Sequence, residues 1–400
     1  MVYYVKNGKL PESRHTFEKK DELRREELVG EESFDGAYSL LYHLYEPTNS
    51  SGYRIVKLKE EKYADAPHVH RHLKTGMLKR DGNLINGRKT ILMNSRVKVQ
   101  VLIPENSTDD FYRNALHEIL IFVHNGKGKF ICPMGSIEFS KGDYIYVPKG
   151  IAFRMEYTED AYFLFLLSLD TLKIPARYLN SYGQLKEGTP YYTRDIRSPE
   201  FFPPEKGTGK YLMHVEFDTY YVVQEFEKSP LDVEGWDGYL YPFAISTDAM
   251  APIVGKLHMP PPIHETISSK SMMVATFLPR KFDFHPRSIP ISYYHNNVDV
   301  DEFLFYSSGN FMSRKGIQPG SVTLHVRGLT HGPQPGATEN AIGKEGTDEV
   351  AVMIETYDPL LLTETGAGID QEFVNIHVVM VIGYGYASGM EISSTEERPY

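Results

Sequence analysis

The stretch YYHNNVDVDEFLFYSSG, residues 293–309, decides the fold of this 400-residue chain. In it, His295, Glu302 and Gly309 follow one another at intervals of seven residues, and the run EFLFY is typical of a buried strand. A second stretch, PGSVTLHVRGLTH at residues 319–331, ends on His331, which is 29 residues beyond Glu302. Glycines in both stretches permit the tight turns that short strands need.

These two stretches resemble the two signature motifs of the cupin superfamily. His295, Asn297 and Glu302 match the first motif, and the second motif occurs twice, at residues 141–153 and 319–331. The resemblance implies a mainly β chain that holds two cupin barrels, each a double-stranded β-helix or jelly roll.

The N-terminal copy lacks most of the first motif. Glu118 keeps the place of the motif glutamate, but Phe111 and Phe153 stand where ligands would be. We therefore expect one structural barrel and one barrel that carries the chemistry. The predicted boundaries are residues 1–180 for the N-terminal barrel with its extensions, 181–235 for an ordered connection, and 236–400 for the C-terminal barrel with the metal site.

The composition also favours a β architecture. The chain has 28 Tyr, 21 Phe, 32 Gly and 25 Pro, which is a mixture of strand formers and turn formers. Short apolar or alternating runs recur between Gly, Pro and Asn clusters, at residues 97–103, 118–123, 144–147, 162–168, 220–226, 272–277, 302–306, 350–355 and 378–383. Helices are expected to be few: a charged one at residues 19–29 (KKDELRREELV) and a short one at 175–179.

The charge balance and hydropathy exclude several classes of partner. With 43 Lys and Arg against 53 Asp and Glu, the net charge is −10, which argues against a general nucleic-acid binder. No apolar run reaches the roughly 18 residues that span a bilayer, and residues 1–17 lack the apolar core of a signal peptide. The single cysteine, Cys132, fits a reducing compartment. We expect a soluble cytoplasmic protein with no nucleic-acid or membrane partner.

His295, Glu302 and His331 together offer two imidazoles and one carboxylate. This set leaves about three coordination positions open on a metal, and it suits non-haem Fe(II) and dioxygen. A ring-cleaving enzyme needs those positions, because it binds a bidentate substrate and dioxygen on one metal. Asn297, where many cupins have another histidine, keeps the number of protein ligands at three. Manganese or nickel could occupy the same ligand set.

Three further stretches are similar to the homogentisate 1,2-dioxygenase family, especially to its shorter bacterial-type members. They are HMPPPIHET (258–266), TLHVRGLTHGPQPGATENAIG (323–343) and QEFEKSPLDVEGWDGYLYPFAIS (224–246). The similarity is dense from about residue 220 to 365 and thinner before that. It implies opening of the homogentisate ring to maleylacetoacetate with Fe(II) and dioxygen, a step in tyrosine and phenylalanine breakdown.

The same resemblance assigns roles to individual residues. His295, Glu302 and His331 match the iron ligands of the family. His258 resembles the histidine that acts as acid and base on the substrate hydroxyl, and His325 matches a substrate-site histidine. Homogentisate is expected to chelate the iron through a ring hydroxyl and its carboxylate, while His258 takes or holds the hydroxyl proton. Family members form trimers and hexamers, so we expect a homo-oligomer.

Tyr293 and Phe311 are the aromatic residues expected to line the substrate cavity. The family has a substrate-contacting tyrosine at the place of Phe311, and the missing hydroxyl removes a hydrogen bond of about 1 kcal/mol. This difference leaves open a dioxygenase for another dihydroxylated aromatic acid, such as gentisate. A further alternative is a non-catalytic metal-binding bicupin, which a fourth protein ligand such as Asn297 or His325 would favour.

Three histidines alternate at residues 68–72 (HVHRH), and in a strand they would share one face. No carboxylate or cysteine beside them completes a ligand set. We therefore interpret them as a polar strand or the rim of a loop rather than as a second metal site.

Overall fold

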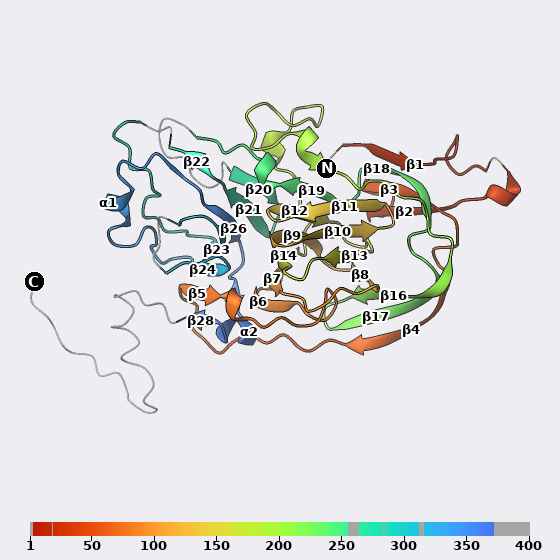
Figure 1. Ribbon diagram of the computed structural model, residues 1–400, viewed down its shortest axis with the longest axis horizontal. Helices are drawn as coiled ribbons and strands as arrows, with labels where there is room; N and C mark the ends of the chain where they lie inside the picture. The colour runs from red at the N-terminus through yellow and green to blue at the C-terminus, as the bar shows by residue number, and fades with distance from the viewer. Residues whose placement is uncertain (1–2, 18, 255–263, 283–284, 312–315, 372–400) are drawn as a thin grey trace, which may run out of the picture.

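The computed structural model describes residues 3–17, 19–254, 264–282, 285–311 and 316–371 (Figure 1). Within these ranges the chain is mainly β, as predicted, and each strand expected from the sequence is present. The predicted strand at 378–383 lies outside the described residues. The short helix expected at 175–179 is a 3-10 turn, η3 (Ala176–Tyr178).

Two large antiparallel sheets form the centre of the protein. The eight-stranded sheet has the order β15 (Ile196–Arg197), β19 (Phe243–Ser246), β12 (Asp143–Val147), β9 (Glu118–Asn125), β14 (Tyr162–Ser168), β7 (Val97–Leu102), β6 (Lys89–Met93), β27 (Leu361–Leu362). The seven-stranded sheet has the order β20 (Glu265–Ser268), β21 (Met272–Phe277), β26 (Val350–Thr356), β23 (Asp301–Ser308), β24 (Ser321–His325), β5 (Arg71–Lys74), β28 (Asp370–Gln371).

Smaller sheets and short helices surround these two. The smaller sheets are β4 (Ser50–Lys57), β17 (Tyr220–Lys228), β16 (Thr208–Glu216), β8 (Phe111–Asn114); β1 (Val5–Gly8), β18 (Val233–Gly238), β3 (Asp35–His43), β2 (Arg25–Glu32); β11 (Gly135–Ser140), β10 (Lys127–Cys132), β13 (Arg154–Tyr157); and β22 (Arg280–Lys281) with β25 (Gly346–Thr347). The helical segments are η1 (Lys20–Glu22), η2 (Thr75–Met77), η4 (Thr193–Asp195), η5 (Thr247–Ala249), α1 (Ala337–Ala341) and α2 (Glu364–Ala367), besides η3. Across the described ranges, no helix has the length and apolar character needed to cross a membrane.

Each large sheet takes strands from a distant part of the chain. Strand β5, an orange arrow in Figure 1, pairs with β24 and lies among the blue strands of the C-terminal half. In the other direction, β27 pairs with β6, and β19 pairs with β12. Backbone hydrogen bonds as well as side-chain packing therefore tie the two halves of the chain together.

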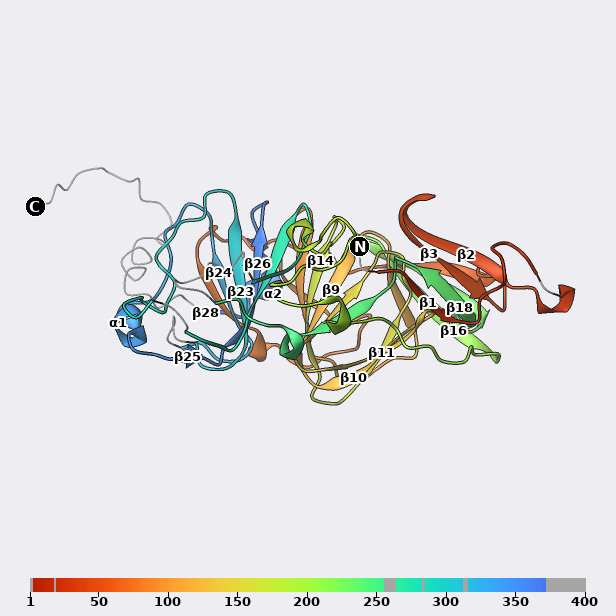
Figure 2. The ribbon, with the colours of Figure 1, turned by 90° about the horizontal axis from the view of Figure 1, so that it is seen from above.

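Strand β23 separates the protein core from the candidate site, because successive side chains of a strand point to opposite faces. Phe303 and Phe305 are fully buried in the large apolar core, where Phe305 meets Phe122 of β9 with ring centroids 6.3 Å apart. Figure 2 shows the two large sheets as neighbouring layers. Glu302 and Leu304 lie on the other face of β23, so one strand positions both the core and the site.

Gly309 of the first motif follows β23 directly. Its φ of +91° lies in the left-handed region, which is unfavourable for any residue that has a β-carbon. A β-carbon at this position would also collide with the backbone of Asp348. The glycine is therefore required both by its conformation and by the close approach of a second segment.

The helix predicted for residues 19–29 is wrong. Only η1 is helical there, and the chain continues as strand β2, which pairs antiparallel with β3. His43 of β3 anchors this pairing, since its ring lies 3.1 Å from Glu27 and 2.7 Å from Asp232. Helix propensity is a weak preference, and the tertiary pairing with β3 outweighs it.

Replacing Phe305 by alanine should destabilise the protein by about 3–5 kcal/mol, because the change opens a cavity between the two sheets. Phe34→Ala is the matched control: Phe34 is 86% exposed, and its loss should change the free energy of unfolding by less than about 0.5 kcal/mol. Denaturant titration followed by the fluorescence of Trp236 measures both. A loss below about 1 kcal/mol for Phe305→Ala would contradict this packing.

Candidate metal centre

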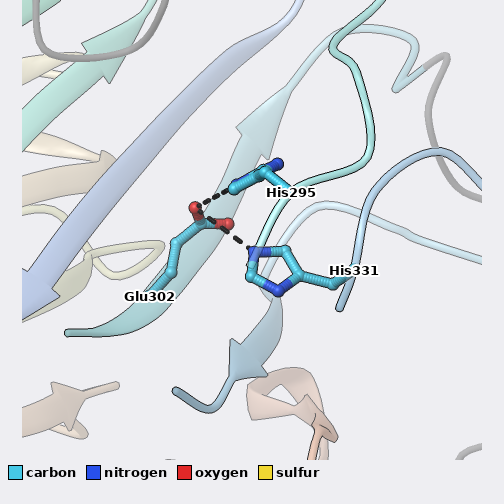
Figure 3. A group of neighbouring side chains, drawn as sticks. All are labelled: His295, Glu302 and His331. Carbon is cyan, nitrogen blue, oxygen red and sulfur yellow. Dashed lines mark hydrogen bonds and ion pairs between the residues drawn. The ribbon is translucent and has the colours of Figure 1, made fainter. Parts of the chain in front are cut away.

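One strand and two loop positions bring the three predicted ligands together (Figure 3). Glu302 is in β23, while His295 and His331 form an isolated β-bridge in which each N–H donates to the other's carbonyl oxygen at 2.9 Å. Their Nε2 atoms lie 3.5 Å (His295) and 3.8 Å (His331) from Oε2 of Glu302, and the three ligand atoms lie within 4.8 Å of one another. Within the described ranges this is the one cluster of His, Cys, Asp or Glu side chains with metal-binding geometry.

Backbone carbonyls orient both imidazole rings. The Nδ1 of His295 lies 3.2 Å from the carbonyl oxygen of Tyr293, and the Nδ1 of His331 lies 3.0 Å from that of Leu329. Because a carbonyl only accepts, each Nδ1 carries a proton. Each Nε2 faces Glu302, where it donates to the carboxylate when protonated and offers its lone pair to a metal once deprotonated. Metal-binding histidines are held in this way by carbonyls or carboxylates. The donor set and its orientation therefore fit a divalent metal ion.

His325 lies inside the same cluster. It stands directly opposite Glu302 in the pairing of β23 with β24, and it donates its Nδ1–H to Oε1 of Glu302 at 2.7 Å. Its ring stacks on that of His331 with 4.5 Å between the centroids. The two rings meet although a turn at Gly328, with a φ of +77°, separates them in the sequence. Glu302 thus holds His325 with one oxygen and turns the other toward His295 and His331.

The surrounding groups set the charge of Glu302. Burial alone would raise the pKa of this carboxyl, but hydrogen bonding to His295, His325 and His331 lowers it well below its ordinary value. The carboxyl is therefore ionised at neutral pH, as a metal ligand must be. For the neighbouring Glu355, burial and the charge of Glu302 raise the pKa to about 7. A divalent ion on Glu302 would offset that repulsion.

Asp301, the residue before Glu302, is fully buried and accepts hydrogen bonds from three segments of the chain. The donors are the His68 ring at 2.8 Å, the backbone N–H and the Nε of Arg327 at 2.9 and 3.0 Å, and the backbone N–H of Leu360 at 2.8 Å. Burial opposes ionisation, but these hydrogen bonds prevail and lower the pKa of Asp301 to about 2. They fix the backbone from which Glu302 projects.

The histidines at residues 68–72 reach this centre, which the sequence analysis did not anticipate. The ring centroid of His70 lies 5.6 Å from those of both His325 and His331. Its Nδ1 accepts the backbone N–H of Val326 at 3.1 Å, a contact between residues 256 apart in sequence. The alternation of histidines was the signal for this segment, but nothing local identifies its distant partner.

The remaining predicted site residues lie in different surroundings. His258 lies outside the described residues. Tyr293 is 62% exposed, two residues before His295. Phe311 is buried and packs on the ring of Tyr306, with 4.7 Å between centroids. Contact of His258, Tyr293 or Phe311 with a substrate stays a prediction.

The motif glutamate of the eight-stranded sheet, Glu118, has protein partners of its own. It is buried and accepts hydrogen bonds from the Tyr146 hydroxyl at 3.0 Å and the backbone N–H of Leu172 at 2.6 Å. Burial raises its pKa to about 7. Phe111 and Phe153, at the other motif positions, are buried in apolar clusters. The surroundings of Glu118 therefore differ from those of Glu302, where three imidazoles converge.

Comparison with known proteins establishes the family. The sequence profile described as Homogentisate 1,2-dioxygenase N-terminal matches residues 83–246. A protein of Saccharolobus solfataricus named "Putative dioxygenase SSO1533" is 43% identical over 366 residues, which cover 89% of this chain and 94% of that protein. The chain belongs to the homogentisate 1,2-dioxygenase family.

More distant relatives carry the name homogentisate 1,2-dioxygenase itself. The protein of Rhodopseudomonas palustris (strain TIE-1) is 24% identical over 360 residues, covering 82% of this chain and 79% of the relative. That of Rhizobium etli (strain CIAT 652) is 25% identical over 317 residues, covering 72% and 68%. Among solved structures, a Cupin 2 conserved barrel domain protein from Leptotrichia buccalis is 8% identical, covers 72% of this chain and 96% of its own, and has a TM-score of 0.35.

Removing one of the three metal-binding side chains should abolish metal binding by this protein. After anaerobic incubation with Fe(II) and dialysis, the wild-type protein should retain metal, whereas His331→Ala and Glu302→Ala should retain little, because two donors hold a divalent ion poorly. His15→Ala is the control, since the side chain of His15 is 95% exposed and distant in the sequence from the ligands. Metal analysis gives the result, and full retention of metal in both ligand variants would contradict the assignment.

Asp301→Asn should weaken metal affinity by about 10–100-fold, because residues that orient metal ligands typically contribute that much. A chelating dye that competes for the metal measures the affinity, and circular dichroism reports whether the variant is folded. His68→Ala removes a single donor to Asp301 and should give a smaller loss, while Asp35→Asn on the exposed end of β3 serves as control. Unchanged affinity in folded Asp301→Asn would show that Asp301 does not position Glu302.

Proposed function

We propose that this protein is an Fe(II)-dependent dioxygenase that opens the ring of homogentisate to maleylacetoacetate in tyrosine and phenylalanine breakdown. The observation that carries the proposal is the cluster of His295, Glu302 and His331, whose two Nε2 atoms and one carboxylate oxygen converge. Membership of the family supports the same class of reaction, since several relatives are named homogentisate 1,2-dioxygenase.

Fe(II) is proposed from the chemistry of the ligand set. Two imidazoles and one carboxylate are the ligands of non-haem Fe(II) oxygenases, and they leave coordination positions for a substrate and dioxygen. When bound, the iron would hold an aromatic diol and dioxygen at one site and carry electron density from the diol to dioxygen. Manganese and nickel accept similar ligands, so the identity of the metal is part of the proposal.

The residues of the chain itself would bind and orient the substrate. His325 holds Glu302 through its Oε1 atom. The carboxylate of Glu302 therefore does not have to change its orientation when a substrate binds. Because His325 donates its Nδ1–H to Glu302, contact between His325 and a substrate would use Nε2. By resemblance to the family, His258 would take or hold the proton of the substrate hydroxyl. Tyr293 and Phe311 are the proposed aromatic contacts of the ring.

The protein is first loaded with Fe(II) in the absence of air. The proposal predicts that it takes up dioxygen when homogentisate and air are then added. Uptake should be stoichiometric with homogentisate, should produce the ultraviolet absorbance of the ring-opened product, and should vanish in His331→Ala, which loses a ligand. An oxygen electrode and absorbance spectra measure the two signals. His15→Ala should behave as the wild type.

Parallel reactions with gentisate distinguish the closest alternative. Phe311 stands where the family has a substrate-contacting tyrosine, so the comparison bears on substrate choice. Dioxygen uptake with gentisate but none with homogentisate would show that homogentisate is not the substrate. The protein would still be a ring-cleaving dioxygenase. Retention of iron without uptake on any aromatic diol would contradict the dioxygenase and favour a non-catalytic bicupin.

A further inference from the structure

Glu355 stands next to the metal centre but is not one of its three clustered ligands. On β26 it lies directly opposite Glu302 of β23, and on its other side it lies opposite Met273 of β21. Residues directly opposite in antiparallel strands point to the same face, with Cβ atoms about 4.5–5.5 Å apart. Glu355 therefore projects from the sheet on the same side as Glu302.

The neighbours of Glu355 on this face of the sheet are mostly apolar and offer its carboxylate no polar contact. Met353, two residues earlier on the same face, is buried in an apolar cluster with Met273 and Ala275. Glu355 itself is half-buried, and its carboxylate has no hydrogen-bond or ion-pair partner within the part of the chain that the structure describes. A carboxylate partly removed from water is unfavourable without a polar partner. This points to a partner that arrives from outside the chain.

A direct bond from Glu355 to the metal does not fit the cluster. The three ligand atoms of His295, Glu302 and His331 lie within 4.8 Å of one another, and no atom of Glu355 joins that group. The position of Glu355, one strand away from Glu302, is instead that of a group that faces a molecule already bound at the metal. The carboxylate oxygens of Glu355 can accept an N–H or O–H from such a molecule, and the charge of a divalent ion bound at Glu302 would favour the ionised form of Glu355.

We propose that Glu355 accepts a hydrogen bond from the ring hydroxyl of the substrate that is not on the metal, and that it thereby selects aromatic diols over monohydroxylated acids. This inference rests on the proposed function and specifies one contact within it. A hydrogen bond to a charged acceptor is stronger than one between neutral groups, so its loss is measurable. The same carboxylate repels an anionic group, which would orient the acid group of the substrate away from Glu355.

The test uses two acids that differ by this hydroxyl alone, homogentisate and 2-hydroxyphenylacetate. Both are titrated by calorimetry, without oxygen, into the Fe(II)-loaded full-length protein. The wild type should bind homogentisate about tenfold more tightly. In Glu355→Leu the preference should disappear, and in Glu355→Gln, where the amide oxygen is a neutral acceptor, it should be intermediate. Glu138→Gln, at an exposed position of β11, is the matched control and should keep the wild-type preference.

Three results would overturn the inference, and they are distinguishable. If both Glu355 variants keep the preference for homogentisate over 2-hydroxyphenylacetate, Glu355 does not contact the hydroxyl, and the proposed function is unaffected. A loss of iron from Glu355→Gln comparable to that from Glu302→Ala makes Glu355 a metal ligand instead. Failure of the wild type to bind either acid removes the hydroxyl contact together with homogentisate as the substrate.

Discussion

The antiparallel pairing of β23 with β24 on one side and β26 on the other sets Glu302, His325 and Glu355 in one row across the sheet. The next residue of β23, Phe303, faces the opposite way into the main core. A shift of one residue in this register would exchange the faces and bury a carboxylate in place of an aromatic ring. Hydrophobic burial therefore specifies the register, and the register in turn specifies the ligand geometry.

Hydrogen bonds to Asp301, the residue beside Glu302, make that geometry rigid. Asp301 gathers donors from His68, Arg327 and Leu360, which belong to three separate parts of the chain. The entropic cost of closing a loop grows only slowly with its length, so a segment near the N-terminus can contribute to a site more than two hundred residues away. This segment reaches the site because β5 pairs with β24.

The sequence predicts the local features of this site well and the long-range ones poorly. His295, Glu302 and His331 follow from motif spacing, and the strands follow from aromatic and β-branched runs. The helix predicted at 19–29 failed, because pairing with β3 is invisible to local propensity. The approach of residues 68–72 to the metal centre depends on a strand pairing that no local pattern encodes.

Glu355 illustrates the same limit at a finer scale. A single acidic residue in the apolar run VAVMIET, residues 350–356, is a visible anomaly. Its meaning appears only when the register places it opposite Glu302, from a strand about fifty residues away. Sequence patterns therefore identify which residues are unusual, while strand pairing identifies which of them act together.

The most direct test of this account is a crystal structure of the protein loaded with Fe(II) without oxygen, with anomalous diffraction collected at the iron edge. We predict one iron peak bound by His295, Glu302 and His331, with the remaining coordination positions free of protein ligands. Iron bound by four or more protein groups, or located at Glu118 instead, would contradict the open metal centre on which the account depends.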